Sequence, residues 1–219
     1  MKRLIDIIIL LIVLSPHLTG VLSASTSTNK VLCYYGAWSG LRDGVGRFDV
    51  SKFDSKLCSH IIYAYAYLSY DNTIRSRDPE FDESDNGYAK LNQLKQANPN
   101  LKTLIAIGGF NDGSPKYSKM AADALKRHAF IQSCLEFIQK YGFDGIELDW
   151  QYPVARGGRA ADRRNYNALV SQLSGQLKSR GYLFGASVSG SYDVVEAAYD
   201  VPQITRYCAF SFYKLFAII

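Results

Sequence analysis

Apolar segments with the length of β-strands alternate with amphipathic segments of helical length along most of this 219-residue chain. The apolar segments are nearly continuous, which is typical of parallel strands that are buried on both faces. Such strand–helix alternation favours a parallel α/β fold. Strands are predicted at 31–38, 59–68, 101–109, 143–151 and 183–189, with 208–216 as a candidate sixth, and helices at about 88–97, at 118–141 and at 166–177.

The length of this repeating unit fits a (β/α)8 TIM barrel, in which the active site lies at the carboxyl ends of the strands. The competing architecture is an open doubly wound sheet, but the chain has no Gly-x-Gly-x-x-Gly turn to support a nucleotide. A complete barrel needs about 250 residues, and only five or six strands are predicted. We therefore expect residues 25–219 to form an incomplete (β/α)8 barrel.

The N-terminus has the pattern of a secretory signal peptide. The basic residues Lys2 and Arg3 precede an apolar run at 4–14, and small residues follow at 23–25. Because this run is too short to span a bilayer, residues 1–24 predict a secreted, extracellular protein without membrane insertion. Secretion makes the 4 cysteines candidates for disulfide bonds.

Several classes of partner are not expected. The basic residues behind the net charge of +5 are scattered along the chain, so no nucleic-acid site is predicted. His60 and His128 lack metal-ligand spacing to other histidines, cysteines or acids, and no motif indicates a cofactor. The acidic residues at 78–85 are interpreted as a solvated charged loop.

Polar residues interrupt one of the predicted strands in a regular way. Glu147, Asp149 and Gln151 alternate with apolar residues and therefore share one face of the strand. Burial of ionised carboxylates carries a large desolvation cost, so packing alone does not explain them. We interpret this face as the floor of a site for a polar ligand.

Aromatic residues indicate what such a ligand is. The chain has 16 Tyr, 11 Phe and 2 Trp, and aromatic surface is well suited to stacking on sugar rings, although most tyrosines are expected in the core or at its rim. Trp38, Tyr65 and Phe110 close predicted strands, as Gln151 does. They are therefore expected at the same edge of the sheet.

The run at 143–153 resembles the signature of glycoside hydrolase family 18, the chitinases. That signature reads Asp-x-x-Asp-x-Asp-x-Glu and ends in the proton-donating glutamate. Asp144 and Asp149 match it, Glu147 replaces an aspartate, and Gln151 stands at the position of the glutamate. Motifs at 33–38, 57–66, 98–110 and 156–162 resemble the family in the same order, so the resemblance covers about 31–208.

The chain departs from the family after Cys208. The family continues with a strand that bears Met-Thr-Tyr-Asp, whereas this chain reads Phe-Ser-Phe-Tyr-Lys-Leu at 210–215. The last strands, the small insertion domain and the final tryptophan of the family have no counterpart. We interpret the chain as a C-terminally truncated member, whether through a gene model, a splice form or a partial sequence.

The resemblance implies a set of site residues in which no catalytic acid is intact. Gln151 occupies the acid position, and Asp149, Glu147 and Asp144 support it. For Tyr35 and Tyr65 a hydrogen-bonded role within the barrel stays an open alternative, and for Phe110 ordinary packing at the strand end. The implied substrate-binding residues are Tyr35, Trp38, Tyr65, Phe110, Asn111, Asp149, Gln151 and Tyr152.

The resemblance also implies a disulfide bond between Cys33 and Cys58, which lie in or beside two strands predicted to be neighbours. Cys134 lies on the apolar face of the predicted helix 118–141, so we interpret it as a buried thiol. Cys208 has no obvious partner.

The family resemblance implies hydrolysis of β-1,4-linked N-acetylglucosamine through the acetamido oxygen of the substrate, with one side chain as general acid. Asp149 is expected to orient the acetamido group and to share a proton with Glu147. The carboxamide of Gln151 keeps the shape and hydrogen-bonding capacity of the acid. It has no proton to release at useful acidity, and acid–base assistance typically contributes ~10²–10⁴-fold.

The leading hypothesis is a secreted, catalytically inactive chitinase-like protein that binds chitin or N-acetylglucosamine oligosaccharides. It resembles the chitinase-like lectins and imaginal disc growth factors of insects, which implies a growth or immune signalling role through a cell-surface receptor. One alternative is a chitinase with weak residual activity through Glu147 or a water chain. Another is a fragment without independent function, since an open half-barrel exposes strand edges and apolar surface.

Overall fold

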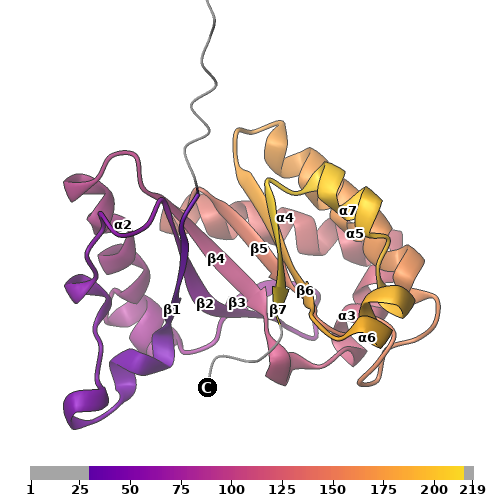
Figure 1. Ribbon diagram of the computed structural model, residues 1–219, viewed down its shortest axis with the longest axis horizontal. Coiled ribbons are helices and arrows are strands. Elements are labelled where there is room, and N and C mark those ends of the chain that lie inside the picture. The colour runs from indigo at the N-terminus through magenta and orange to yellow at the C-terminus, as the bar shows by residue number, and fades with distance from the viewer. Residues whose placement is uncertain (1–29, 215–219) are drawn as a thin grey trace, which may run out of the picture.

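The computed structural model describes residues 30–214 (Figure 1). The predicted signal peptide at 1–24 lies outside the described residues, as does the end of the candidate strand 208–216. The strands are β1 (Leu32–Gly36), β2 (His60–Leu68), β3 (Ile74–Ser76), β4 (Lys102–Gly108), β5 (Gly145–Asp149), β6 (Leu183–Ser189) and β7 (Phe210–Lys214). The α-helices are α2 (Gly87–Ala97), α3 (Pro115–Ala121), α4 (Ala124–Tyr141), α5 (Asp162–Lys178), α6 (Tyr192–Ala198) and α7 (Val201–Tyr207).

The sheet has the topology of an incomplete (β/α)8 barrel. Parallel strands follow one another in the order β1-β2-β4-β5-β6-β7, and β3 pairs antiparallel with β2. This order follows the chain without a reversal, whereas a doubly wound sheet changes direction at a switch point. Helix α2 lies toward the β1–β2 end of the sheet, and α5 and α7 lie toward the β6–β7 end (Figure 1).

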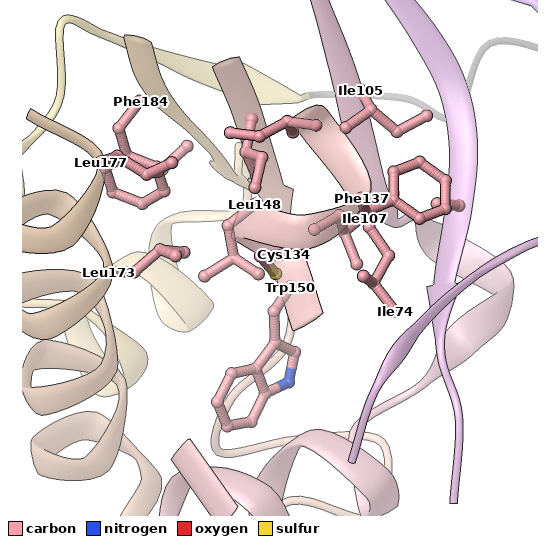
Figure 2. Close-up of a cluster of buried hydrophobic side chains, with 14 of the residues drawn as sticks. Ile74, Ile105, Ile107, Cys134, Phe137, Leu148, Trp150, Leu173, Leu177 and Phe184 are labelled. Carbon is pink, nitrogen blue, oxygen red and sulfur yellow. The ribbon is translucent and has the colours of Figure 1, made fainter. Parts of the chain in front are cut away.

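The two faces of the sheet carry different side chains. On the helix side, Leu148 of β5 and Phe184 of β6 pack with Leu173 of α5 and Cys134 of α4 in one buried cluster (Figure 2). The opposite face has a separate, smaller apolar cluster of Ile62, Ala64, Leu104 and Ala106, against which Tyr34, Tyr65 and Phe210 pack. Because side chains alternate along a strand, the residues between the helix-side positions of β5 must point to this second face.

The prediction of one continuous helix at 118–141 is wrong. The segment forms α3 and α4, which are separated at Ala122 and Asp123. The carboxylate of Asp123 accepts hydrogen bonds from the backbone N–H groups of Leu125 (2.8 Å) and Lys126 (3.1 Å). A side chain that satisfies these amides is an N-cap, so the second helix begins there.

The prediction of a solvated acidic loop at 78–85 is also wrong for its central residue. Asp82 lies in a π-helical turn, η4 (Glu80–Ser84), and is only 1% exposed. Its carboxylate accepts hydrogen bonds from the hydroxyls of Tyr63 (2.6 Å), Ser76 (2.6 Å) and Tyr88 (3.2 Å). These donors compensate the cost of burying the charge, and they attach the loop to β2, β3 and α2.

The cysteines take the places that the sequence indicated. Cys33 and Cys58 form a disulfide bond that links β1 to the segment before β2. Cys134 is a free, buried thiol, and burial raises its pKa well above the usual value. Cys208 is also a free thiol, and burial raises its pKa to about 12. Across residues 30–214, every helix is too short or too polar to cross a membrane.

Candidate functional site

Three polar side chains lie along β5 and just after its carboxyl end, where the strand predicted to reach residue 151 ends at Asp149. Glu147, Asp149 and Gln151 are 0%, 1% and 5% exposed. The strand register places Glu147 between Ala106 of β4 and Gly185 of β6. The absence of a side chain at Gly185 makes room for the Phe210 ring, because a Cβ atom at Gly185 would lie 2.0 Å from that ring.

Gln151 and Asp149 interact directly. The amide Nε2 of Gln151 donates a hydrogen bond of 2.8 Å to Oδ1 of Asp149. The backbone carbonyl oxygen of Gln151 accepts a hydrogen bond of 2.7 Å from the hydroxyl of Tyr199. This hydroxyl in turn accepts a hydrogen bond from the backbone N–H of Ser189. The side chain and the main chain of Gln151 are therefore both held in place.

Glu147 reaches across to the neighbouring strand. The hydroxyl of Ser187 on β6 donates a hydrogen bond to Oε1 of Glu147. The hydroxyl of Tyr34 lies 3.3 Å from that of Ser187. Burial, followed by the nearby Glu147 carboxylate, raises the pKa of Tyr34 well above its usual value, so this phenol keeps its proton near neutral pH.

The structure corrects the assignment of Tyr35 to the site. Tyr35 is 2% exposed, packs on Tyr63 with ring centroids 5.4 Å apart, and donates a hydrogen bond to the carbonyl of Phe48. It belongs to the helix-side core, which fits the barrel role that the sequence left open. The preceding residue, Tyr34, lies on the face of the acids instead. Adjacent residues of a strand point to opposite faces, and a single sequence does not show which tyrosine faces which way.

Trp38 follows the carboxyl end of β1 and forms an aromatic pair with Tyr65, which lies within β2 one residue beyond its last pair with β1 and does not close the strand as predicted. Their ring centroids are 6.1 Å apart with an interplanar angle of 13°. Trp38 lies in the 3-10 helix η1 (Ala37–Leu41) and is 37% exposed. Gly109 allows Tyr65 its position, because a Cβ atom at Gly109 would lie 3.1 Å from the Tyr65 ring and the φ angle there is +94°.

Phe110 and Tyr152 lie together at the ends of the next two strands. Phe110 begins the 3-10 helix η5 (Phe110–Asp112), is 43% exposed, and makes an edge contact with Tyr152 at 6.0 Å between centroids. Asn111, in the same turn, is exposed. The loops after β4 and β5 thus bring these three predicted residues to one edge of the sheet.

Ser114 fastens these two loops to each other. Its hydroxyl donates to the carbonyl of Tyr152 and accepts a hydrogen bond of 3.0 Å from the indole N–H of Trp150. Its backbone N–H donates to the carbonyl of Arg156 over 3.1 Å. No motif or periodicity in the sequence singles out Ser114.

Asp144, predicted to support the acid position, lies elsewhere. It precedes β5, at the amino end of the strand, whereas Gln151 follows the carboxyl end; seven residues of extended chain span about 23 Å. Its carboxylate pairs with Lys95 at 2.6 Å and accepts from the backbone N–H of Thr103 at 2.8 Å. Asp144 is therefore a structural residue.

Two further site residues were missed by the sequence interpretation. Ser187 was detectable, because a polar residue interrupts the apolar strand 183–189. Tyr199 was not, since it lies after α6 and only the fold brings it to the end of β5. Within residues 30–214, no group of three or more His, Cys, Asp or Glu side chains is arranged to hold a metal ion.

Comparisons with known proteins give the family. A model of Glycosyl hydrolases family 18 matches residues 30–217. Probable chitinase 2 of Drosophila melanogaster is 40% identical over 182 residues, which cover 81% of this chain and 38% of that protein.

Solved structures give the same result. The Group IV chitinase of Ostrinia furnacalis has a TM-score of 0.81 and 36% identity, and the match covers 84% of this chain and 50% of that one. Human YKL-39, a pseudo-chitinase with retained chitooligosaccharide binding properties, has a TM-score of 0.73 and 28% identity over the same shares. The chain therefore spans half or less of the length of these proteins.

Proposed function

The chain belongs to glycosyl hydrolase family 18, and we propose that it is a secreted chitinase-like protein that binds chitin or N-acetylglucosamine oligosaccharides without hydrolysing them. The observation that carries this proposal is Gln151. Family 18 enzymes use the acetamido oxygen of the substrate as nucleophile. The substrate therefore supplies the nucleophile, and the protein must supply the general acid from one side chain.

Gln151 occupies the position of that acid in the signature, but its side chain is an amide. Its side chain is buried at the carboxyl end of β5 and its amide is bonded to Asp149. An amide can donate hydrogen bonds to a glycosidic oxygen, but it does not protonate a leaving group. Loss of acid–base assistance lowers the rate by about 10²–10⁴-fold, and we expect hydrolysis to be negligible.

We infer that sugar binding is retained from the aromatic and polar side chains at this edge of the sheet. Trp38 after β1 and Phe110 after β4 expose aromatic surface, and Asp149 is a hydrogen-bond acceptor at the carboxyl end of β5. Sites for small polar ligands typically combine apolar walls with a few placed polar groups. A pseudo-chitinase relative with retained chitooligosaccharide binding supports the same separation of binding from cleavage. The proposal includes secretion through the signal-like pattern at 1–24 and recognition by a cell-surface receptor.

The test compares the wild-type chain with Gln151→Glu and with Gln203→Glu, a matched control at an exposed position. Each protein is titrated calorimetrically with the N-acetylglucosamine tetramer and assayed on a fluorogenic chitobioside. We expect all three to bind the tetramer, and only Gln151→Glu to hydrolyse, at least about 100-fold faster than the wild type.

Two results would contradict the proposal. Hydrolysis by the wild type at the rate of Gln151→Glu would show that the chain is an enzyme. Absence of binding heat for a wild-type chain that unfolds cooperatively on heating would show that the site has lost sugar recognition.

A further inference from the structure

An exposed arginine covers the aromatic ring that borders the site. The guanidinium carbon of Arg156 lies 4.0 Å from the centroid of the Phe110 ring and 5.2 Å from that of Tyr152. Both distances fall within the range of cation–π attraction. Arg156 comes from the loop after β5, and Phe110 from the loop after β4.

Arg156 also holds the backbone on both sides of this contact. Its Nη1 donates a hydrogen bond to the carbonyl of Phe110, and its own carbonyl accepts from the N–H of Ser114. The φ angle of Arg156 is +50° and that of Gly157 is +87°, a bend that returns the chain toward Phe110. A planar guanidinium can stack on a ring and donate in its own plane at the same time, which a lysine ammonium cannot do.

We propose that Arg156 is a positioning residue of the sugar-binding site: it fixes the Phe110 ring in one orientation, with one face covered and the other available to a single pyranose ring. This inference rests on the proposed function. Fixing an exposed ring before the ligand arrives reduces the ordering cost of binding. The arginine thus acts on affinity through Phe110.

The contact of Arg156 with the Phe110 ring and carbonyl, called the clamp below, can be detected by NMR without a ligand. A guanidinium over a ring face experiences the ring current, so the side-chain N–H resonances of Arg156 are expected to be shifted upfield in the NMR spectrum. These resonances are identified by their loss in Arg156→Ala. Phe110→Leu should return them to ordinary values, and unchanged resonances in Phe110→Leu would overturn the clamp.

The binding test is a double-mutant cycle with the N-acetylglucosamine tetramer. Arg156→Ala should weaken binding by about 3–10-fold, Arg156→Lys should recover part of that loss, and Arg164→Ala, an exposed arginine of α5, should change nothing. In the Phe110→Leu background, Arg156→Ala should have almost no further effect. A merely structural arginine would cost the same in both backgrounds.

The outcomes separate this inference from the proposed function. If the wild type binds no tetramer, the proposed function fails and the positioning role fails with it. If the wild type binds and Arg156→Ala costs equally with or without the Phe110 ring, or costs nothing, only the positioning role is overturned. Thermal unfolding of each variant shows whether it is folded, and Arg156→Lys repeats the comparison if Arg156→Ala is not.

Discussion

The amide of Gln151 donates to Asp149 over 2.8 Å at the end of β5. This is a fixed donor, because an amide nitrogen keeps its protons at every pH at which the protein is folded. A carboxyl at the same position would be donor or acceptor according to its protonation. The substitution therefore replaces a titrating contact with a permanent one, in the place where the family signature has its acid.

Removal of the buried carboxylate at Asp82 should destabilise the fold. In Asp82→Ala the hydroxyls of Tyr63, Ser76 and Tyr88 lose this acceptor, and we expect a loss of about 3 kcal/mol or more in the free energy of unfolding. Urea unfolding of the chain measures the difference. Asp85→Ala, at an exposed position in the same loop, should stay within about 0.5 kcal/mol of wild type; equal losses for both would show that the Asp82 contacts contribute little.

A side chain at Gly109 should disturb the aromatic pair of Trp38 and Tyr65. The added Cβ of Gly109→Ala would lie 3.1 Å from the Tyr65 ring, at a φ of +94°, so we expect a loss of about 1–2 kcal/mol in stability and weaker tetramer binding. The control is Gly175→Ala, within α5 and with nothing within 4 Å of the new Cβ, which should gain about 0.5–1 kcal/mol. Unaltered stability and affinity in Gly109→Ala would contradict the close packing described here.

Loss of the disulfide bond should lower stability without altering the site chemistry. Cys33 and Cys58 are separated by 25 residues, and a loop of this size corresponds to about 2–4 kcal/mol of stabilisation. We expect the double variant Cys33→Ser/Cys58→Ser to unfold at lower denaturant concentration by this amount. Reductant should shift the wild type toward the variant and leave the variant unchanged, whereas a wild type insensitive to reductant would contradict the prediction.

His60 should make the fold less stable in mild acid. The ring is 7% exposed; burial first, and then Lys30 and Lys102, lower its pKa below 6.5, with Asp144 opposing them. Above that value the ring is neutral in both states. As the pH falls below it, the unfolded chain takes up the proton more readily than the folded chain, so stability is lost.

The measurement is the free energy of unfolding at pH 7.5 and pH 5.5. His60→Asn should show a smaller decrease between the two than wild type. His128→Asn, at an exposed position, should keep the wild-type decrease. The idea would be abandoned if His60→Asn retained it as well.

Much of the fold is predictable because parallel strands buried on both faces require long apolar runs. All six such runs are strands in the structure, and β7 starts two residues into its predicted range. The break between α3 and α4 was missed because the apolar periodicity continues across it and the cap comes from one side chain, that of Asp123. The burial of Asp82 was missed because its three donors come from separate parts of the chain.

The site was less predictable, because a single sequence shows neither which face of the sheet a side chain points to nor which motif residues lie at the same end of a strand. Alternation shows that Tyr34 and Tyr35 face opposite ways, and only the assembled sheet shows that Tyr34 faces the acids. The family motif also suggests one shared role for Asp144 and Gln151. In the structure these two residues lie at opposite ends of β5, and Asp144 pairs with Lys95 instead. Gln151 itself needed no structure, because a missing acid is visible in the sequence.

The fastening of the loops by Ser114 bears on how such a protein diverges. Since one serine bonds the carbonyl of Tyr152, the indole of Trp150 and the carbonyl of Arg156, neither loop can be transplanted from another barrel without the other. A change of backbone conformation in one loop would break hydrogen bonds to the other loop, so we expect the two loops to change together during evolution. Side chains around Gln151 can therefore be replaced one at a time, whereas the backbones of the loops after β4 and β5 can change only together.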